Sequence, residues 1–306
     1  MNDHARGLCA LLILVSLAVF SCERPAAKTA TEDEPPVNSQ GDRNGEADAS
    51  QSEFPPTLAP FVQRIEGTTV EFTMVPIAAS VLRSGAPDGH DPVEVAPFYI
   101  GQTEVTWDLF DVFVYGLDIP EEDKASDAVT RPSKPYVPPD RGFGHAGYPA
   151  ISMTHQSAQK FCEWLSTKTG RRYRLPTEAE WAMVAQRCEA EGDLTAHEWF
   201  RDNADAQTHE VATKSACVTG VYDLFGNAAE WTNGVNGKPV VCGGAYSDDA
   251  SLISAATRRS QTSAWNMSDP QMPKSKWWLP DAPFVGIRLV CEIDVGETDA
   301  GNNTPQ

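Results

Sequence analysis

The chain has 306 residues, of which 41% are hydrophobic and 9% aromatic, enough for one large domain with a substantial core. Its formal net charge of −19 excludes the basic surface that a phosphate backbone requires, so nucleic acid is not an expected partner. The same negative charge favours solubility and the binding of cations.

The first 22 residues have the pattern of a targeting segment. A short polar start precedes an apolar run over residues 8–20, and these 13 residues are too few to span a bilayer. Ser21 and Cys22 follow as in a bacterial lipobox, although Phe20 is larger than usual there. We therefore expect residues 1–22 to be a lipoprotein signal peptide, with Cys22 carrying the lipid. The alternative is an ordinary cleaved signal peptide, and in both cases the mature protein is exported.

Composition then divides the mature chain into three parts. Residues 23–56 are rich in Ala, Pro, Ser, Thr, Asp and Glu and contain few large apolar side chains. Such a segment cannot bury enough surface to offset chain entropy, so we expect a disordered, acidic and proline-rich tether. Residues 57–295 form the single expected domain. Residues 296–306 are expected to be a disordered polar tail.

The domain begins with strand patterns and one short helix. Residues 69–75 alternate polar and apolar side chains, and residues 93–103 contain a second apolar stretch. A helix is expected over residues 106–115, with its first residue, a threonine, as the N-cap. Later apolar runs at 239–242 and 285–291 have the length of strands.

Two further helices have stronger signals. Over residues 154–169, apolar side chains recur at i, i+3, i+4 and i+7 between Thr154 as N-cap and Gly170 beyond the end. Thr177 starts the sequence TEAE, a capping box in which a hydroxyl and a carboxylate satisfy free amide donors. Two to three helices among short antiparallel strands and long loops predict an irregular α+β fold rather than a parallel α/β sheet.

Several segments resemble, in order, the motifs of the formylglycine-generating-enzyme family, also called sulfatase-modifying factors. These segments are FYIGQTEVT at 98–106, YPAIS at 148–152, FCEWL at 161–165, YRLPTEAEW at 173–181, VYDLFGNAAEW at 221–231, GGAY at 243–246 and GIR at 286–288. A single motif of this kind is weak, whereas the ordered series identifies the chain as a divergent member. The resemblance implies a fold similar to that of C-type lectins, which agrees with the irregular α+β pattern.

The loop over residues 223–230 predicts a calcium site. Asp223 and Glu230 are hard oxygen donors, and calcium accepts six to eight oxygens, including backbone carbonyls. The alternative is that Asp223 caps a turn while Glu230 pairs with Arg259 or Arg288. The ligands that the resemblance implies are the side chains of Asp223 and Glu230 and the carbonyls of Gly226 and Ala228.

The reaction centre of the family is not retained. The resemblance implies two copper-binding Cys soon after the GGAY segment, where this chain has Asp248 and Ile253, and a Ser where it has Ala245. Thiolates suit a soft Cu(I) ion, whereas Asp and Ile cannot hold it. Copper and the family's catalytic residues are therefore not expected, and the chain has the pattern of a pseudoenzyme. Four further residues are expected near the substrate cleft, as a salt-bridged loop or as a site of altered chemistry: Asp249, Arg258, Arg259 and Trp265.

The cysteines suggest disulfides, because an exported protein meets an oxidising compartment. Loss of the signal peptide and lipidation of one Cys leave five of the seven. The family joins a helix Cys to a strand Cys, so the resemblance implies a bond between Cys162 and Cys291. A bond between Cys188 and Cys217 is a second candidate, and Cys242 would keep its thiol. The alternative is that all five are buried hydrophobic thiols.

These features favour an exported, lipid-anchored binding module at the cell envelope, stabilised by calcium and without oxidase activity. Its expected ligand is a protein, peptide or glycan, and the membrane is its other partner. One alternative is a protein-modifying enzyme that uses the same cleft, either as a formylglycine-generating-type oxidase of polypeptide Cys or with altered chemistry. Another is a structural envelope component whose cleft has no ligand.

Overall fold

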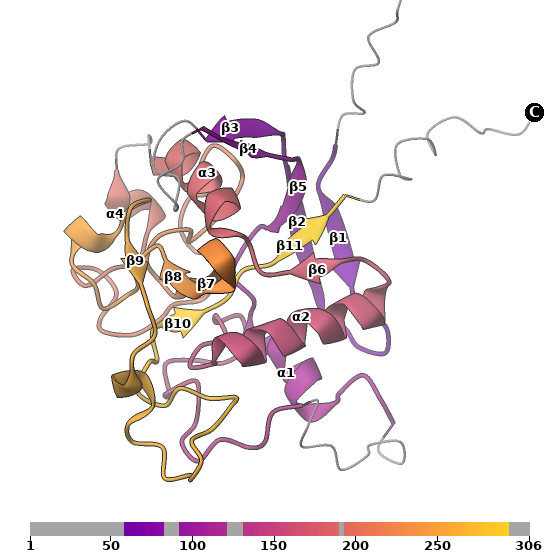
Figure 1. Ribbon diagram of the computed structural model, residues 1–306, viewed down its shortest axis with the longest axis vertical. Helices are drawn as coiled ribbons and strands as arrows, with labels where there is room; N and C mark the ends of the chain where they lie inside the picture. Colours follow the sequence, from indigo (N-terminus) through magenta and orange to yellow (C-terminus); the bar gives the residue numbers. More distant parts are fainter. Residues whose placement is uncertain (1–57, 83–91, 121–130, 190–192, 294–306) are drawn as a thin grey trace, which may run out of the picture. The chain divides into compact units, whose positions relative to one another are not determined.

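A five-stranded antiparallel sheet brings both ends of the domain together. Its order is β1 (Phe61–Arg64), β2 (Glu71–Ile77), β5 (Phe98–Gly101), β11 (Val290–Glu292) and β6 (Tyr173–Arg174). Ile100 of β5 pairs with Val290 of β11, so segments near opposite ends of the domain are hydrogen-bonded neighbours. Figure 1 shows β11 lying between β5 and β6.

Two smaller sheets complete the strand inventory of the described residues. One has the order β10 (Val285–Gly286), β7 (Ala229–Asn233), β8 (Pro239–Cys242) and β9 (Arg258–Arg259). Only its β10–β7 pair is parallel. The other pairs β3 (Ser80–Leu82) with β4 (Val93–Val95). The expected run over 285–291 is thus split between β10 and β11, in two different sheets.

The three longer helices form where the sequence predicts them, and one further helical turn, α4, was not predicted. They are α1 (Trp107–Tyr115), α2 (His155–Thr169), α3 (Glu178–Cys188) and a single turn, α4 (Leu194–His197). Short 3₁₀ turns are η3 (Val235–Gly237), η4 (Ala250–Leu252) and η5 (Ser263–Asn266). The Thr154 side chain caps α2, and Thr177 with Glu180 makes both bonds of the capping box on α3. Thr106 precedes α1 in extended conformation, but its side chain makes no capping hydrogen bond.

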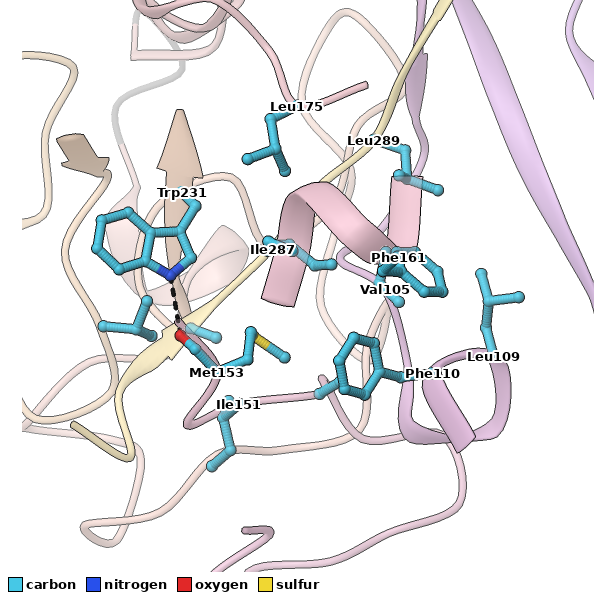
Figure 2. Close-up of a cluster of buried hydrophobic side chains, with 14 of the residues drawn as sticks. Val105, Leu109, Phe110, Ile151, Met153, Phe161, Leu175, Trp231, Ile287 and Leu289 are labelled. Atoms are coloured by element: carbon cyan, nitrogen blue, oxygen red, sulfur yellow. Dashed lines mark hydrogen bonds between the residues drawn. The ribbon is translucent and has the colours of Figure 1, made fainter. Parts of the chain in front are cut away.

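The large sheet separates two groups of buried side chains. Successive residues of a strand point to opposite faces, so Tyr99 of β5 joins one cluster while Phe98 and Ile100 join the other. The first cluster packs α1 and α2 through Phe110 and Phe161, whose rings lie 5.2 Å apart. Figure 2 shows this cluster. The second cluster packs α3. The predicted α+β fold with short strands is therefore confirmed.

One predicted disulfide is correct and one is wrong. Cys188 and Cys217 are bonded, with Cα atoms 5.2 Å apart. Cys162 and Cys291 are not joined, and both thiols are buried. The strand Cys lies two residues later than in the family, which keeps its face but moves it about 6–7 Å along the strand. Sharing a face of the strand does not by itself place two sulfur atoms within bonding distance. Cys242 is also a buried thiol, as expected.

The computed structural model describes residues 58–82, 92–120, 131–189 and 193–293. The predicted signal peptide with Cys22, the tether over 23–56 and the tail over 296–306 lie outside the described residues. None of the helices within those described ranges combines the length and the apolar character needed to cross a bilayer.

Candidate functional site

The predicted calcium loop is a strained turn that fits closely against a neighbouring segment. Asp223 and Asn227 have positive φ angles of 49° and 42°, which non-glycine residues rarely adopt. Gly226 has φ 78°, and a Cβ atom there would lie 2.2 Å from the carbonyl oxygen of Trp199. Only glycine fits this position. Gly226 is therefore required by the backbone conformation and by the close contact with Trp199.

Glu230, at the end of this loop, is held by a buried arginine. Its Oε1 accepts hydrogen bonds from Nε of Arg288 at 2.8 Å and from Nη2 at 2.7 Å. Its Oε2 accepts one from the indole N–H of Trp181 at 2.8 Å. Arg288 also donates to the carbonyls of Gly101, Tyr222 and Asp223. The pairing of Glu230 with Arg288, which the sequence left as the alternative, is what the structure has.

Three more buried carboxylates surround this pair. Asp223 accepts from the backbone N–H of Ala212 at 2.7 Å through Oδ2, whereas its Oδ1 has no hydrogen-bond partner. Glu104 accepts from Ala228 N–H at 3.3 Å through Oε1, and its Oε2 also has no partner. Glu198 accepts from the N–H of Phe225 at 3.1 Å. Pattern reasoning missed Glu104 and Glu198, although Glu104 lies within the 98–106 motif.

Burial and neighbouring negative charges raise the pKa values of these three carboxyl groups. Burial raises the pKa of Glu104 well above its usual value, and the nearby charge of Asp223 raises it further. Burial likewise raises the pKa of Asp223 to about 6, against hydrogen bonding from Ala212 and the charge of Arg288. The pKa of Glu198 is also raised well above its usual value, by burial first and by Asp223 second. The loop is therefore a strongly electronegative interior site.

The predicted calcium ligands fit this geometry only in part. Asp223 has an unpaired buried oxygen, as a cation ligand would, and calcium takes oxygen donors. Glu230 does not fit, because Arg288 and Trp181 occupy both of its oxygens. Among the residues that the structure describes, no three His, Cys, Asp or Glu side chains gather as a metal-binding group. Any cation here must therefore use few side chains and more backbone or water oxygens.

The two residues at the expected copper positions, Asp248 and Ile253, form an ion pair and pack in the core, respectively. Asp248 forms an ion pair with Arg259 through Oδ1, and its Oδ2 accepts from Ala245 N–H at 2.8 Å. Ile253 is buried in the second core cluster. A Cβ atom on Gly244 would lie 2.8 Å from Cδ1 of Ile253, so this side chain packs directly against the preceding turn.

Comparison with known proteins identifies the family. The family model for the sulfatase-modifying factor enzyme 1-like domain matches residues 64–270. The chain belongs to the sulfatase-modifying factor family. The comparison with curated proteins gave no match.

Solved structures support the family fold. Treponema denticola variable protein 1 is 21% identical with a TM-score of 0.55, covering 78% of this chain and 100% of its own. PvdO from Pseudomonas aeruginosa is 21% identical with a TM-score of 0.53, covering 79% and 100%. The protein CarF is 20% identical with a TM-score of 0.51, covering 72% and 98%. At such identities the likeness concerns the fold alone.

The four residues expected near the cleft of this family member differ in their partners. Asp249 forms an ion pair with Arg201. Arg258 donates to Glu178 at 2.6 Å and stacks over Trp181. By contrast, two of the four share a neighbour, the Phe284 ring, which lies 5.3 Å from the guanidinium of Arg259 and 5.2 Å from the ring of Trp265. Three of the four residues, Asp249, Arg258 and Arg259, therefore form salt bridges, as expected for a salt-bridged loop.

A second polar feature, which sequence reasoning did not single out, lies at the end of α1. His145 contacts Asp140 through Nδ1 at 2.9 Å and Asp111 through Nε2 at 2.8 Å, and its ring stacks on Trp107. Burial alone would lower the pKa of His145, but the hydrogen bonds to the two aspartates outweigh it and raise the pKa. This group borders a hollow of about 390 Å³. Tyr136, 70% exposed, is part of its wall.

Proposed function

We propose that this chain is an exported, lipid-anchored member of the sulfatase-modifying factor family that binds a protein, peptide or glycan at the cell envelope without oxidising it. The observation that carries the proposal is the Asp248–Arg259 ion pair at a position where the family has a copper-binding Cys. Oxidation in the family requires two thiolates, and a carboxylate committed to a guanidinium is not a ligand for Cu(I).

The remaining thiols support the same proposal. Cys242 is fully buried, and its Sγ lies 3.5 Å from the hydroxyl of Thr232 on the neighbouring strand of the four-stranded sheet. Burial raises the pKa of this thiol to about 12, so the reactive thiolate is disfavoured at neutral pH. Cys162 and Cys291 are buried as well. A two-thiolate copper site would require the core to rearrange.

A surface suited to ligand binding supports the binding role. The hollow beside His145 is lined by tyrosines and prolines together with charged side chains. Exposed Tyr136 and half-exposed Tyr115 both contribute to it, and tyrosine is enriched in protein interfaces. Apolar walls with a few fixed polar groups are typical of ligand sites. Calcium belongs to the same proposal as a stabilising ion near Asp223.

The test is a reaction with a thiol peptide. The chain is incubated with copper, oxygen and a Cys-containing sulfatase-type peptide, and the peptide mass is followed over time. We expect the peptide to keep its thiol at the rate of a protein-free control. A family oxidase that has the Cys pair serves as the positive control. Conversion of the Cys to an aldehyde by this chain would show that it is an oxidase after all.

A further inference from the structure

Two aspartates beside α1 already hold a cation that the chain itself supplies. Both ring nitrogens of His145 contact carboxylate oxygens, of Asp111 at 2.8 Å and of Asp140 at 2.9 Å. An ionised carboxylate only accepts hydrogen bonds, and a neutral imidazole has only one N–H. Both contacts are therefore hydrogen bonds only when His145 is an imidazolium, which donates to both aspartates.

This bridge joins two separate elements of the fold. Asp111 lies on α1, whereas Asp140 and His145 lie in the loop that precedes α2. The Trp107 ring, also on α1, stacks on the imidazole with centroids 5.2 Å apart. A cation over an indole face is attracted by the negative charge of that face. Two carboxylates and an aromatic ring thus form a setting that suits a positive charge.

A hollow of about 390 Å³ lies beside the bridge and has the same character. His145 uses only Oδ2 of each aspartate, and a carboxylate has about four lone-pair sites, so acceptor capacity remains. The side chains of Asp111 and Asp140 are 19% and 23% exposed, so a ligand can reach them. Four aromatic side chains line the same hollow: Trp107, Tyr115, Tyr136 and Trp278.

We propose that this hollow binds an arginine side chain of a partner polypeptide, which replaces the proton of His145 as the positive charge between Asp111 and Asp140. The inference rests on the binding role in the proposed function and names the chemical class of its ligand. Arginine fits best because its planar guanidinium both stacks on aromatic rings and donates to carboxylates. The net charge of −19 also attracts a basic partner.

The exchange makes binding depend on pH. One N–H bond of the imidazolium breaks, the proton passes to solvent, and neutral His145 keeps one hydrogen bond. Burial lowers the pKa of His145, but the hydrogen bonds to the two aspartates outweigh it and raise the pKa. Below that pKa the ligand must displace a proton, so binding is weaker, and above it binding reaches its full strength. The other titratable groups around the bridge are Asp108 and Tyr115 of α1 and Lys134 of the loop.

Titration of the full chain with a short peptide tests the proposal. The probe is acetyl-Gly-Gly-Arg-Gly-Gly-amide, and the indole N–H signals in NMR spectra report its binding. The matched peptide carries citrulline, which has the shape of arginine without its charge. At about pH 8 we expect the arginine peptide to bind about ten-fold more tightly than the citrulline peptide.

The pH dependence is measured with the same peptide. Lowering the pH to about 5.5 should weaken binding of the arginine peptide by about three-fold or more, because His145 is then protonated. His145→Gln keeps one hydrogen bond to an aspartate but carries no proton to displace. It should bind the arginine peptide and lose this pH dependence.

Variants of the two aspartates locate the site. Asp111→Asn and Asp140→Asn each remove one carboxylate, and each should weaken the arginine peptide about ten-fold at about pH 8. Two such variants keep the test decisive if one of them does not fold. Glu163→Gln is the matched control, because Glu163 lies on the surface of α2, is 63% exposed and pairs with Lys160. It removes the same charge and should bind the peptide as the wild type does.

Every other outcome counts against the proposal. Equal binding of the two peptides would overturn recognition of the charge while keeping the binding role of the chain. Binding of neither peptide would overturn the arginine site itself. Arginine binding that survives both aspartate substitutions would indicate general attraction to an acidic chain, and binding independent of pH in the wild type would contradict exchange with the His145 proton. The thiol-peptide reaction decides the non-oxidase proposal separately.

Discussion

Replacing Arg288 by methionine is expected to lower the free energy of unfolding by about 3–5 kcal/mol, the usual cost of removing one partner of a buried ion pair. Arg288 is fully buried and donates to Glu230 and to three backbone carbonyls. Methionine fills much of the same volume but donates nothing, so Glu230 would keep only the indole of Trp181. Chemical denaturation of the purified chain measures the effect.

A surface arginine provides the matched control. Arg64 pairs with Glu71 at 3.0 Å, but the two side chains are 82% and 53% exposed. Exposed pairs contribute little, so Arg64→Met should change the free energy of unfolding by at most about 1 kcal/mol. Equal effects of the two substitutions would contradict the view that Arg288 organises the loop.

The Trp231→Ala substitution is expected to cost about 3–5 kcal/mol, as large-to-small changes in a core do. Trp231 is fully buried, and its indole N–H donates to the carbonyl of Met153 at 3.0 Å (Figure 2). Its ring also contacts His155 and Trp265 edge-on or tilted. The substitution therefore leaves a cavity and an unpaired buried carbonyl. Unfolding in denaturant measures the combined loss in the free energy of unfolding.

Tyr136→Ala is the control for this core substitution. The Tyr136 side chain is 70% exposed, so its removal should change stability by no more than about 0.5 kcal/mol. A Trp231→Ala protein as stable as Tyr136→Ala would contradict the core role of Trp231.

Local signals in the sequence were sufficient for the helices. The starts of α2 and α3 depend on Thr154 and Thr177 and on residues three positions later, so short-range pattern decides them. The same pattern also predicts that the Thr106 side chain caps α1. Its backbone has the extended conformation of a cap residue, but its side chain makes no capping hydrogen bond. The split of the 285–291 run also escaped prediction, because pairing partners in two different sheets decide where β10 ends and β11 begins.

The candidate site was predicted only where its residues share a motif. Asp223 and Glu230 lie in one loop, so the sequence could group them, whereas Glu104 reaches Ala228 across 124 positions of the chain. No periodicity links such residues. Which partner Glu230 has likewise depends on a distant residue, because Arg288 lies 58 positions further along the chain. The structure pairs Glu230 with Arg288, and calcium at this loop stays a prediction.

The proposed absence of a copper site is supported by the contacts of the two residues that stand at the expected Cys positions. Asp248 is tied to Arg259 and to the backbone of Ala245, and Ile253 is part of the core. Restoring oxidase chemistry would require new thiolates and the removal of an ion pair. The family fold is retained in this chain.

Titration of the chain with Cu(I), with the Cys188–Cys217 disulfide kept intact and in competition with a chromogenic Cu(I) chelator, tests this central claim most directly. We predict that the chain takes no stoichiometric Cu(I) from the chelator, because Cys162, Cys242 and Cys291 are buried and Asp248 is paired with Arg259. Tight uptake of one Cu(I) per folded chain, abolished by Cys242→Ser, would contradict the account.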